Sequence, residues 1–148
     1  MGQNNKVIRL LKFRTMLFND AGEWKERGIE NRVTKVGNFL RKTRLDEFPQ
    51  LWNVIRGDIS LIGPRPEFPN AVKHYSEELP YYNVRHLIKP GLSGWAQIYG
   101  EHPHHGVDVN KTANKLSYDL YYIKNRSFFL DIKIALQTIK TLGSIAGR

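Results

Sequence analysis

Two adjacent carboxylates, Asp46 and Glu47, follow a strongly basic segment that contains Arg41, Lys42 and Arg44. A carboxylate flanked by such cations stays ionised at neutral pH. Ionised carboxylates in an electropositive setting can serve catalysis, and the arginines beside them suit phosphate. The types and spacing of these residues therefore favour chemistry on a phosphorylated substrate.

A helix that begins after these carboxylates would hold them in place. Its apolar residues recur at helical spacing and are Phe48, Leu51, Trp52 and Ile55. Pro49 suits the first turn of a helix, where its missing N–H would have had no partner. Asp46 and Glu47 would then lie near unpaired N–H groups and the positive end of the helix dipole, where phosphate also binds. An aspartate before a helix is more often a simple N-cap, so spacing alone leaves both interpretations open.

The Gly-Pro-Arg-Pro sequence at residues 63–66 is a second candidate. Its two prolines restrict the backbone around Arg65 and hold the guanidinium in a fixed place. A guanidinium presents a planar set of donors that suits phosphate. The alternative is an ordinary turn with an exposed arginine.

Composition and charge predict one globular domain with acidic partners. The chain has 148 residues, of which 41% are hydrophobic and 25% charged, and it contains no cysteine. This excludes a disulfide framework and a thiolate metal site, and it fits a reducing compartment. The net charge of +9 favours nucleic acid, anionic lipid or a phosphorylated small substrate as a partner. No apolar run approaches the ~20 residues of a membrane-spanning helix, and no signal peptide opens the chain.

Hydrophobic periodicity predicts a helix-rich α/β (α+β) domain over residues 1–148, with several amphipathic helices around a small sheet or hairpin. Extended segments are predicted at residues 7–16, 59–62 and 89–99, and a loop at residues 17–31. Helices are predicted at residues 32–43, 67–79 and 114–125, followed by a helix capped by Ser127 and ended by Gly143. Phe68, Val72 and Tyr75 are expected to point inward.

Two further features leave alternatives open. The helix at residues 32–43 is basic on one face and apolar on the other, which suits a surface helix or a membrane interface. His102, His104 and His105 could bind a transition metal, but the neighbouring proline and glycine favour a loop.

Several motifs together resemble one family. They are Lys12-Phe13-Arg14-Thr15-Met16, Leu45-Asp46-Glu47, Pro49-Gln50-Leu51, Gly63-Pro64-Arg65-Pro66, Lys89-Pro90-Gly91, Gly94-Trp95-Ala96-Gln97 and Tyr118-Asp119-Leu120. In this order, and over nearly the whole chain, the sequence resembles the bacterial sugar transferases, the monotopic polyprenyl-phosphate phosphoglycosyl transferases. A membrane-embedded segment precedes the matching region in that family, so we expect an N-terminally truncated catalytic domain.

The resemblance implies transfer of a phospho-sugar from a UDP-sugar donor to polyprenyl phosphate, as the first step of bacterial polysaccharide synthesis. Asp46 would attack the phosphorus next to the sugar, form an aspartyl phospho-sugar and release UMP. Glu47 would be catalytic beside it and would bind Mg²⁺. The residues expected to bind phosphate or substrate are Lys12, Arg14, Arg41, Arg65, Arg85 and Asp119. The enzyme would work on the cytoplasmic face of the bacterial inner membrane.

The charge also suggests two rival functions. A nucleic-acid-binding module usually shows a helix-turn-helix, an aromatic platform or a basic repeat, and none is evident in the sequence, so no nucleic-acid partner is expected. A basic membrane-surface or assembly module with weak catalysis is the other rival. The sequence carries no code for the donor sugar or for the oligomeric state.

Overall fold

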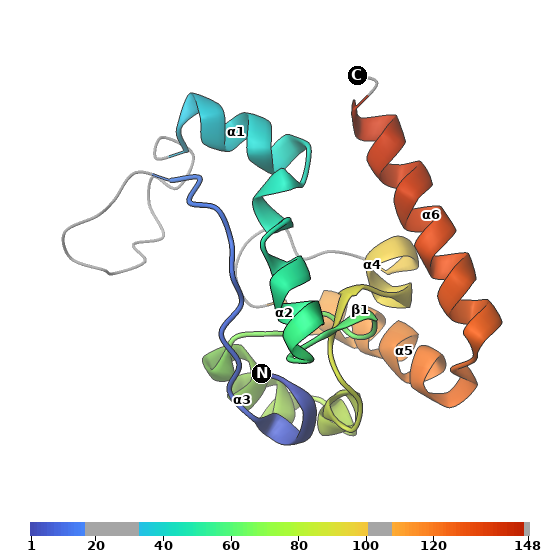
Figure 1. Cartoon of the computed structure of the whole chain (residues 1–148). Helices are drawn as coiled ribbons and strands as arrows, with labels where there is room; N and C mark the ends of the chain where they lie inside the picture. The colour runs from blue at the N-terminus through green and yellow to red at the C-terminus, as the bar shows by residue number, and fades with distance from the viewer. Residues whose placement is uncertain (17–32, 101–107, 147–148) are drawn as a thin grey trace.

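The structure is a helix-rich α/β domain, as predicted (Figure 1). A computed structural model describes residues 1–16, 33–100 and 108–146. The helices are α1 (Lys35–Lys42), α2 (Gln50–Arg56), α3 (Pro69–Glu78), α4 (Trp95–Tyr99), α5 (Val109–Asn125) and α6 (Phe128–Ala146). The 3-10 turns are η1 (Gln3–Asn5), η3 (Leu45–Glu47) and η4 (Tyr82–His86), and the strands are β1 (Ser60–Ile62) and β2 (Gly91–Ser93). The helices predicted at residues 32–43, 67–79 and 114–125 are confirmed apart from their ends.

The small sheet brings the Gly-Pro-Arg-Pro turn against a second glycine-rich segment. β1 and β2 run parallel, with Ser60 opposite Gly91 and Ile62 opposite Ser93. They do not form a hairpin, because α3 and η4 lie between them and return the chain to the same end of the sheet. A Cβ on Gly91 would lie 2.1 Å from the Gly63 nitrogen. Glycine is therefore required at this crossing, which fixes the start of the turn against β2.

Buried side chains join the helices on one side of this sheet. The cluster that links α3, η4 and α5 consists of Val72, Tyr75, Leu79, Tyr82 and Leu116. Phe68 was predicted to point inward and is instead 76% exposed. Its backbone is extended and it precedes α3, so it does not share the helical phase of Val72 and Tyr75. The prediction for Phe68 is wrong for this reason.

The N-terminal segment is extended but does not form the strand predicted at residues 7–16. Its described part makes only an isolated bridge, between Met16 and Val33. The side chain of Asn53 replaces a neighbouring strand: its Oδ1 accepts the Leu11 N–H at 3.0 Å, and its Nδ2 donates to the Arg9 carbonyl at 2.8 Å. The segment is thus held against α2 by one amide side chain. The loop predicted at residues 17–31 and the three histidines lie outside the described residues.

Residues 89–99 differ from the extended segment predicted for them. Only Gly91–Ser93 is a strand, and the residues after Gly94 form the short helix α4. This helix brings the rings of Trp95 and Tyr99 to a centroid distance of 4.3 Å, and Trp95 also stacks on Tyr121 of α5. The strand predicted after Gly94 is therefore wrong: these residues form a helix, and the ring of Trp95 packs against α5.

Helix α6 starts as predicted and ends later. The Ser127 hydroxyl accepts a hydrogen bond from the Leu130 N–H at 3.3 Å. Gly143 does not end the helix, which continues to Ala146. Among the described glycines only Gly57 has the positive φ that typically ends a helix, so Gly143 keeps helical geometry at a small cost.

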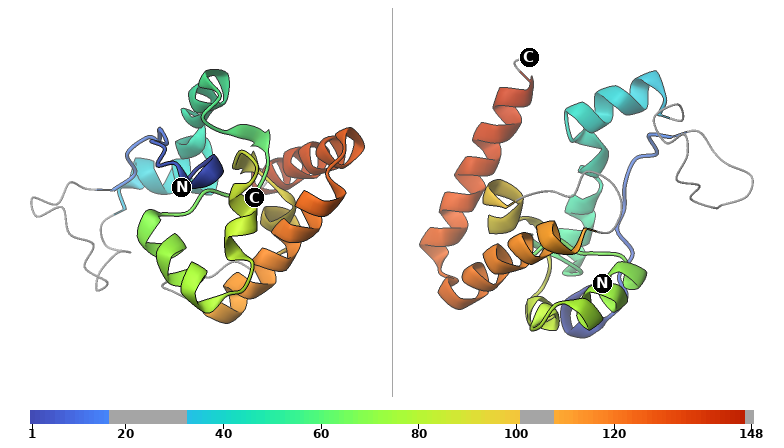
Figure 2. Two further views of the ribbon diagram at one scale, coloured as in Figure 1. Left: turned by 90° about the horizontal axis from the view of Figure 1, so that it is seen from below. Right: turned by 180° about the vertical axis from the view of Figure 1, so that it is seen from behind.

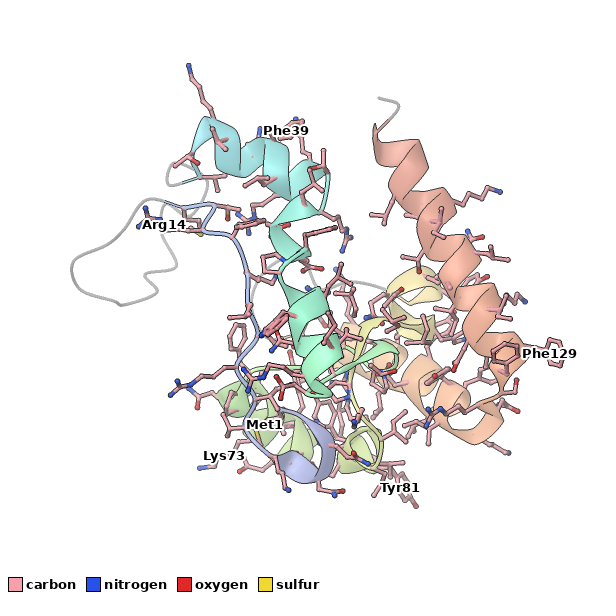
Figure 3. The ribbon with its side chains drawn as sticks, viewed as in Figure 1. Met1, Arg14, Phe39, Lys73, Tyr81 and Phe129 are labelled. Atoms are coloured by element: carbon pink, nitrogen blue, oxygen red, sulfur yellow. The ribbon has the colours of Figure 1, made fainter. Side chains whose placement is uncertain are left out.

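Several apolar helix faces are exposed. Helix α2 buries Gln50 and Asn53 and turns Trp52 and Ile55 outward. The stripe predicted on α6 is exposed as well, at Ile132, Leu136, Ile139 and Leu142. Phe39 on α1 and Phe129 at the start of α6 also project from the ribbon (Figure 3). Helix α1 and the C-terminal half of α6 lie at the same end of the molecule, opposite α3 (Figures 1 and 2). Contiguous apolar surface of this kind marks an interaction site.

None of the described helices is both long enough and apolar enough to span a bilayer.

Candidate active site

Glu47 lies at the centre of the site, on η3 between α1 and α2. Its Oε1 atom is 2.8 Å from Lys12 Nζ and 2.5 Å from Arg65 Nη2, and the side chain is 13% exposed. Burial alone would raise the pKa of Glu47, but the hydrogen bonds and charges of Arg65 and Lys12 outweigh it and lower the pKa from 4.5 to about 2. The carboxylate is therefore ionised throughout the physiological pH range.

The turn that carries both carboxylates begins at a residue with left-handed backbone geometry. Arg44 has a φ of 58°, which is uncommon for a residue other than glycine. The chain then passes through η3 and reaches α2 after Pro49. Asp46 and Glu47 thus lie just before a helix, as predicted. That helix has only 7 residues, and a 3-10 turn rather than the helix itself presents the carboxylates.

Asp46 differs from Glu47 in its surroundings. Within the described parts of the chain, no hydrogen bond or ion pair engages its carboxylate, whereas its backbone carbonyl accepts the Phe13 N–H at 3.0 Å. The Asp46 carboxylate is still close enough to Arg65 to interact with its charge. Burial lowers the pKa of Arg65, but Glu47, and to a smaller extent Asp46, help to raise this pKa above its usual value. Within the described residues, one carboxylate is thus held by two cations, whereas its neighbour makes no ion pair.

The Gly-Pro-Arg-Pro turn presents Arg65 to Glu47 from the other side of the site. The Pro64 carbonyl accepts the Gly91 N–H at 2.9 Å, which ties the turn to β2. The Arg65 carbonyl accepts a hydrogen bond from Arg85 Nη2, also at 2.9 Å. Backbone contacts on both sides of Arg65 therefore set where its guanidinium lies.

Arg85 and Asp119 belong to a buried ionic network behind this turn. The two side chains are 2% exposed, with Arg85 Nη2 lying 2.8 Å from Asp119 Oδ2. Arg85 also donates to the Tyr82 hydroxyl at 2.8 Å, and Lys115 pairs with Glu67 nearby. Burial would lower the pKa of Arg85, but Asp119, Tyr82 and Glu67 together outweigh it and the pKa is raised. The structure thus places Arg85 in contact with the backbone of Arg65 and Asp119 in contact with Arg85, both away from solvent.

Arg14 and Arg41, the other two predicted phosphate ligands, are exposed. Arg14 lies near the end of the described N-terminal segment (Figure 3), and Arg41 lies in the last turn of α1. The described residues supply no ion-pair partner for either side chain. Both remain predictions, because the contacts that join Lys12, Glu47 and Arg65 do not extend to them.

A groove of about 520 Å³ opens beside Glu47 and Arg65. One wall comes from η3, α2 and β1, and the other from β2, α4 and α6. The walls are mostly apolar, and the residues that line them include Leu45, Phe48, Leu51, Leu61, Ile98, Ile139 and Leu142. Its polar lining includes Glu47, Arg44 and Arg65. We call this cavity the α2–α6 groove.

Comparison with known proteins identifies the family of the chain. The model of the bacterial sugar transferase family matches residues 1–144. The chain belongs to the bacterial sugar transferases. This confirms the resemblance that its motifs indicated.

Relatives of this sugar transferase act on lipid-linked phosphates, according to their names. It is 44% identical over 147 residues to a UDP-N-acetylgalactosamine-undecaprenyl-phosphate N-acetylgalactosaminephosphotransferase of Aeromonas hydrophila, covering 96% of this chain and 33% of the relative. It is 40% identical over 140 residues to a UDP-glucose:undecaprenyl-phosphate glucose-1-phosphate transferase of Escherichia coli (strain K12), covering 93% of this chain and 30% of the relative. The chain therefore spans about a third of the length of these two relatives.

A third relative is an uncharacterized sugar transferase, EpsL, of Bacillus subtilis (strain 168). It is 40% identical over 139 residues, which cover 94% of this chain and 64% of the relative.

A Mg²⁺ ion in the sugar transferase site would find two adjacent carboxylates. The described residues hold no group of three or more His, Asp or Glu side chains suited to a metal, but Mg²⁺ binds through one or two carboxylates, phosphate oxygens and water. Asp46 and Glu47 supply two adjacent carboxylates. Lys12 and Arg65 already balance their two negative charges, so a divalent cation is attracted only when a diphosphate adds negative charge. The residues fit a metal that arrives with a nucleotide diphosphate.

The site also contains residues that sequence analysis did not single out. Asn53 positions the segment that carries Lys12, and residues of α6 such as Ile139 line the groove. Asn53 gave no signal, because a polar residue among apolar neighbours is ordinarily taken to face solvent. The apolar stripe on α6 was a signal, since Ile132, Leu136, Ile139 and Leu142 recur at helical spacing, but its spacing alone did not connect it with Glu47.

Proposed function

We propose that this sugar transferase moves a phospho-sugar from a UDP-sugar to polyprenyl phosphate at a membrane surface. The observation that carries the proposal is the contrast within one turn, where Glu47 is held by Lys12 and Arg65 while the Asp46 carboxylate is available. The names of the relatives support the two substrates.

The reaction takes place in two displacements at one phosphorus atom. In the first, a carboxylate oxygen of Asp46 attacks the phosphorus that bears the sugar. A bond forms between Asp46 and this phosphorus, and the bond to the bridging oxygen breaks, so that UMP leaves with the electron pair. In the second, an oxygen of the polyprenyl phosphate attacks the same phosphorus. Asp46 leaves as a carboxylate, and the product is a polyprenyl diphospho-sugar.

The basic residues make this attack possible. A carboxylate is a weak nucleophile, and it approaches a diphosphate that is itself negative, so charge neutralisation and alignment dominate the barrier. Lys12 and Arg65 face the same turn from two different elements and supply this positive charge. Glu47 holds both cations at the position where Asp46 reacts. Mg²⁺, held by Glu47 and Asp46 with the donor diphosphate, would neutralise charge on the phosphate oxygens.

The exposed apolar helices support work at a membrane surface. Helix α1 turns Val36 and Phe39 to solvent and carries Arg41 and Lys42 in its last turn. A helix of this kind lies in a membrane interface, where the cations meet anionic lipid head groups. The negative surface potential of the cytoplasmic leaflet favours that face of the bacterial inner membrane.

The test is to incubate the chain with a UDP-sugar and Mg²⁺ in the absence of acceptor. We expect release of UMP and a gain in intact mass equal to the UDP-sugar minus UMP, which is one sugar phosphate less a water molecule. Asp46→Asn should abolish both, whereas the matched exposed variant Glu78→Gln on α3 should retain both. A mass adduct that forms normally on Asp46→Asn would show that another residue is the nucleophile.

A further inference from the structure

The α2–α6 groove combines apolar walls with charged residues of the reactive turn. Its walls are apolar along most of their length, yet Glu47 and Arg65 of the reactive turn line the same cavity. A matching ligand must therefore be a hydrocarbon with one anionic end. We propose that the groove receives the first isoprene units of the polyprenyl phosphate, with the phosphate beside Arg65 and Arg44. This inference rests on the proposed function and adds where the acceptor lies.

The chemistry of the two substrates distinguishes them at this groove. A UDP-sugar carries hydroxyl, amide and phosphate groups along its whole length, and apolar walls would leave them without hydrogen-bond partners. An isoprenoid chain has no such groups and gains from leaving water. The groove therefore fits the acceptor chain and excludes the donor from its apolar part.

The charged residues in the lining of the groove argue against a protein segment as the occupant. An apolar helix docked against α6 would place its backbone and side chains over Arg44 and Arg65 without supplying negative charge. A lipid phosphate supplies that charge to both arginines. Arg44 lines the groove together with Arg65 and precedes the turn that carries Asp46.

The position of the groove accounts for how an acceptor could reach Asp46 from a membrane. The groove is bounded by α6, whose C-terminal half lies at the same end of the molecule as α1 (Figure 1). Ile139 and Leu142 are on this half of α6 and line the groove. A lipid that enters between α2 and α6 would thus keep its tail at the apolar end while its phosphate lies next to the reactive turn.

Two substitutions on α6 separate this binding site from general adhesion to lipid. Ile139 lines the groove and is 67% exposed, whereas Leu136 does not line it and is 63% exposed. Both are changed to serine, and KM is measured for undecaprenyl phosphate and for the short analogue geranyl phosphate. Ile139→Ser should raise the KM for undecaprenyl phosphate by about fivefold or more, as expected for loss of one apolar contact. It should raise the KM for geranyl phosphate to a similar extent, because the two isoprene units of this analogue lie in the groove, and Leu136→Ser should change neither.

Two readouts separate this proposal from the proposed function. Release of UMP from the donor alone should be unchanged in Leu136→Ser, which lies outside the groove, and a wild-type chain that releases none would count against the proposed function. Independently of donor, a polyprenyl phosphate with a photoreactive group in its first isoprene units should label α6 near Ile139 in the wild type and less in Ile139→Ser.

Three results would overturn the assignment of the groove. Equal increases in KM for Ile139→Ser and Leu136→Ser would indicate adhesion to lipid alone. A lower melting temperature of Ile139→Ser with an unchanged acceptor KM would indicate that protein covers the groove. Labelling confined to residues outside the groove would place the chain elsewhere.

Discussion

The guanidinium of Arg85 donates a hydrogen bond to the backbone carbonyl of Arg65 across 2.9 Å, while Asp119 pairs with the same guanidinium at 2.8 Å. Because Arg85 and Asp119 are buried, they act on the site indirectly, through the backbone of the Gly-Pro-Arg-Pro turn. Arg65 then contacts Glu47. Arg85 and Asp119 are thus positioning residues for Arg65.

This chain of contacts predicts that Arg85 and Arg65 are coupled. Arg85→Lys keeps the positive charge opposite Asp119. It loses the planar guanidinium, which contacts Asp119 and the Arg65 carbonyl at the same time. We expect it to lower kcat by about tenfold, against about a hundredfold or more for Arg65→Ala, the range found when one donor to developing charge is removed. In the Arg65→Ala background, Arg85→Lys should change kcat by less than about twofold.

A double-mutant cycle on kcat measures this coupling, and melting temperatures recorded alongside show how much stability each variant loses. The contrary result is that Arg85→Lys lowers kcat about tenfold both in the wild type and in Arg65→Ala. That result would mean that Arg85 does not act through Arg65 and contributes only to the fold.

Glu47 should make the stability of the chain depend on pH. Its pKa falls from 4.5 in the unfolded chain to about 2 in the folded one, so its contribution is complete above pH 4.5 and is lost as the pH falls toward 2. Glu47→Gln should lower the free energy of unfolding by about 2 kcal/mol near pH 7, and the difference should shrink below pH 4.5. Urea titrations at several pH values measure it.

Glu78→Gln, on the exposed surface of α3, serves as the control and should give a difference near zero at every pH. A Glu47→Gln deficit that stayed constant down to pH 3 would mean that the ion pairs with Lys12 and Arg65 contribute nothing to folding.

Two glycines offer a matched test of the close crossing at the sheet. Gly91→Ala would place a Cβ 2.1 Å from the backbone nitrogen of Gly63, so the strands must separate. We expect a loss of at least about 2 kcal/mol in stability, together with weaker donor binding because the turn that carries Arg65 moves. Gly143→Ala meets nothing within 4 Å and lies in α6, so it should stabilise the chain by up to about 1 kcal/mol. Thermal unfolding of both variants and the donor KM are the measurements.

Metal binding should depend on the donor. Since Lys12 and Arg65 balance the charges of Asp46 and Glu47, calorimetry should detect weak binding of Mg²⁺ to the chain alone and at least tenfold tighter binding when UDP is present. Glu47→Ala should remove this gain while leaving the binding of Mg²⁺ to free UDP as it is. Equal affinity with and without UDP would argue against a metal that arrives with the diphosphate.

Local rules predicted the turn that carries Asp46 and Glu47, because a proline and an apolar repeat define the start of a helix within a few residues. They could not predict that Lys12 contacts Glu47 across 35 positions of sequence, since that contact depends on Asn53. The N-terminal segment was taken for a strand because its residues are branched and aromatic. Side-chain hydrogen bonds from Asn53 supply what a neighbouring strand would have supplied.

The apolar stripes on α2 and α6 were recognised, but their direction was not. A stripe rule assumes that apolar side chains face the protein interior and polar ones face water. In α2 the opposite holds, with Gln50 and Asn53 buried and Trp52 and Ile55 exposed. A helix that lies against lipid turns its apolar face outward. The spacing of apolar residues is the same whether that face points outward or inward, so sequence alone does not give its direction.

The hold of Asn53 on the N-terminal segment has a mechanical consequence. Lys12, Asp46 and Glu47 all lie on α2 or on segments attached to it, whereas Arg65, Arg85 and Asp119 lie on the opposite body of the domain. Glu47 and Arg65 join these two groups of residues through two hydrogen bonds, of 2.5 and 3.5 Å. If a lipid moves α2 away from α6, this ion pair should lengthen, so the separation of its two side chains would report that the acceptor has bound.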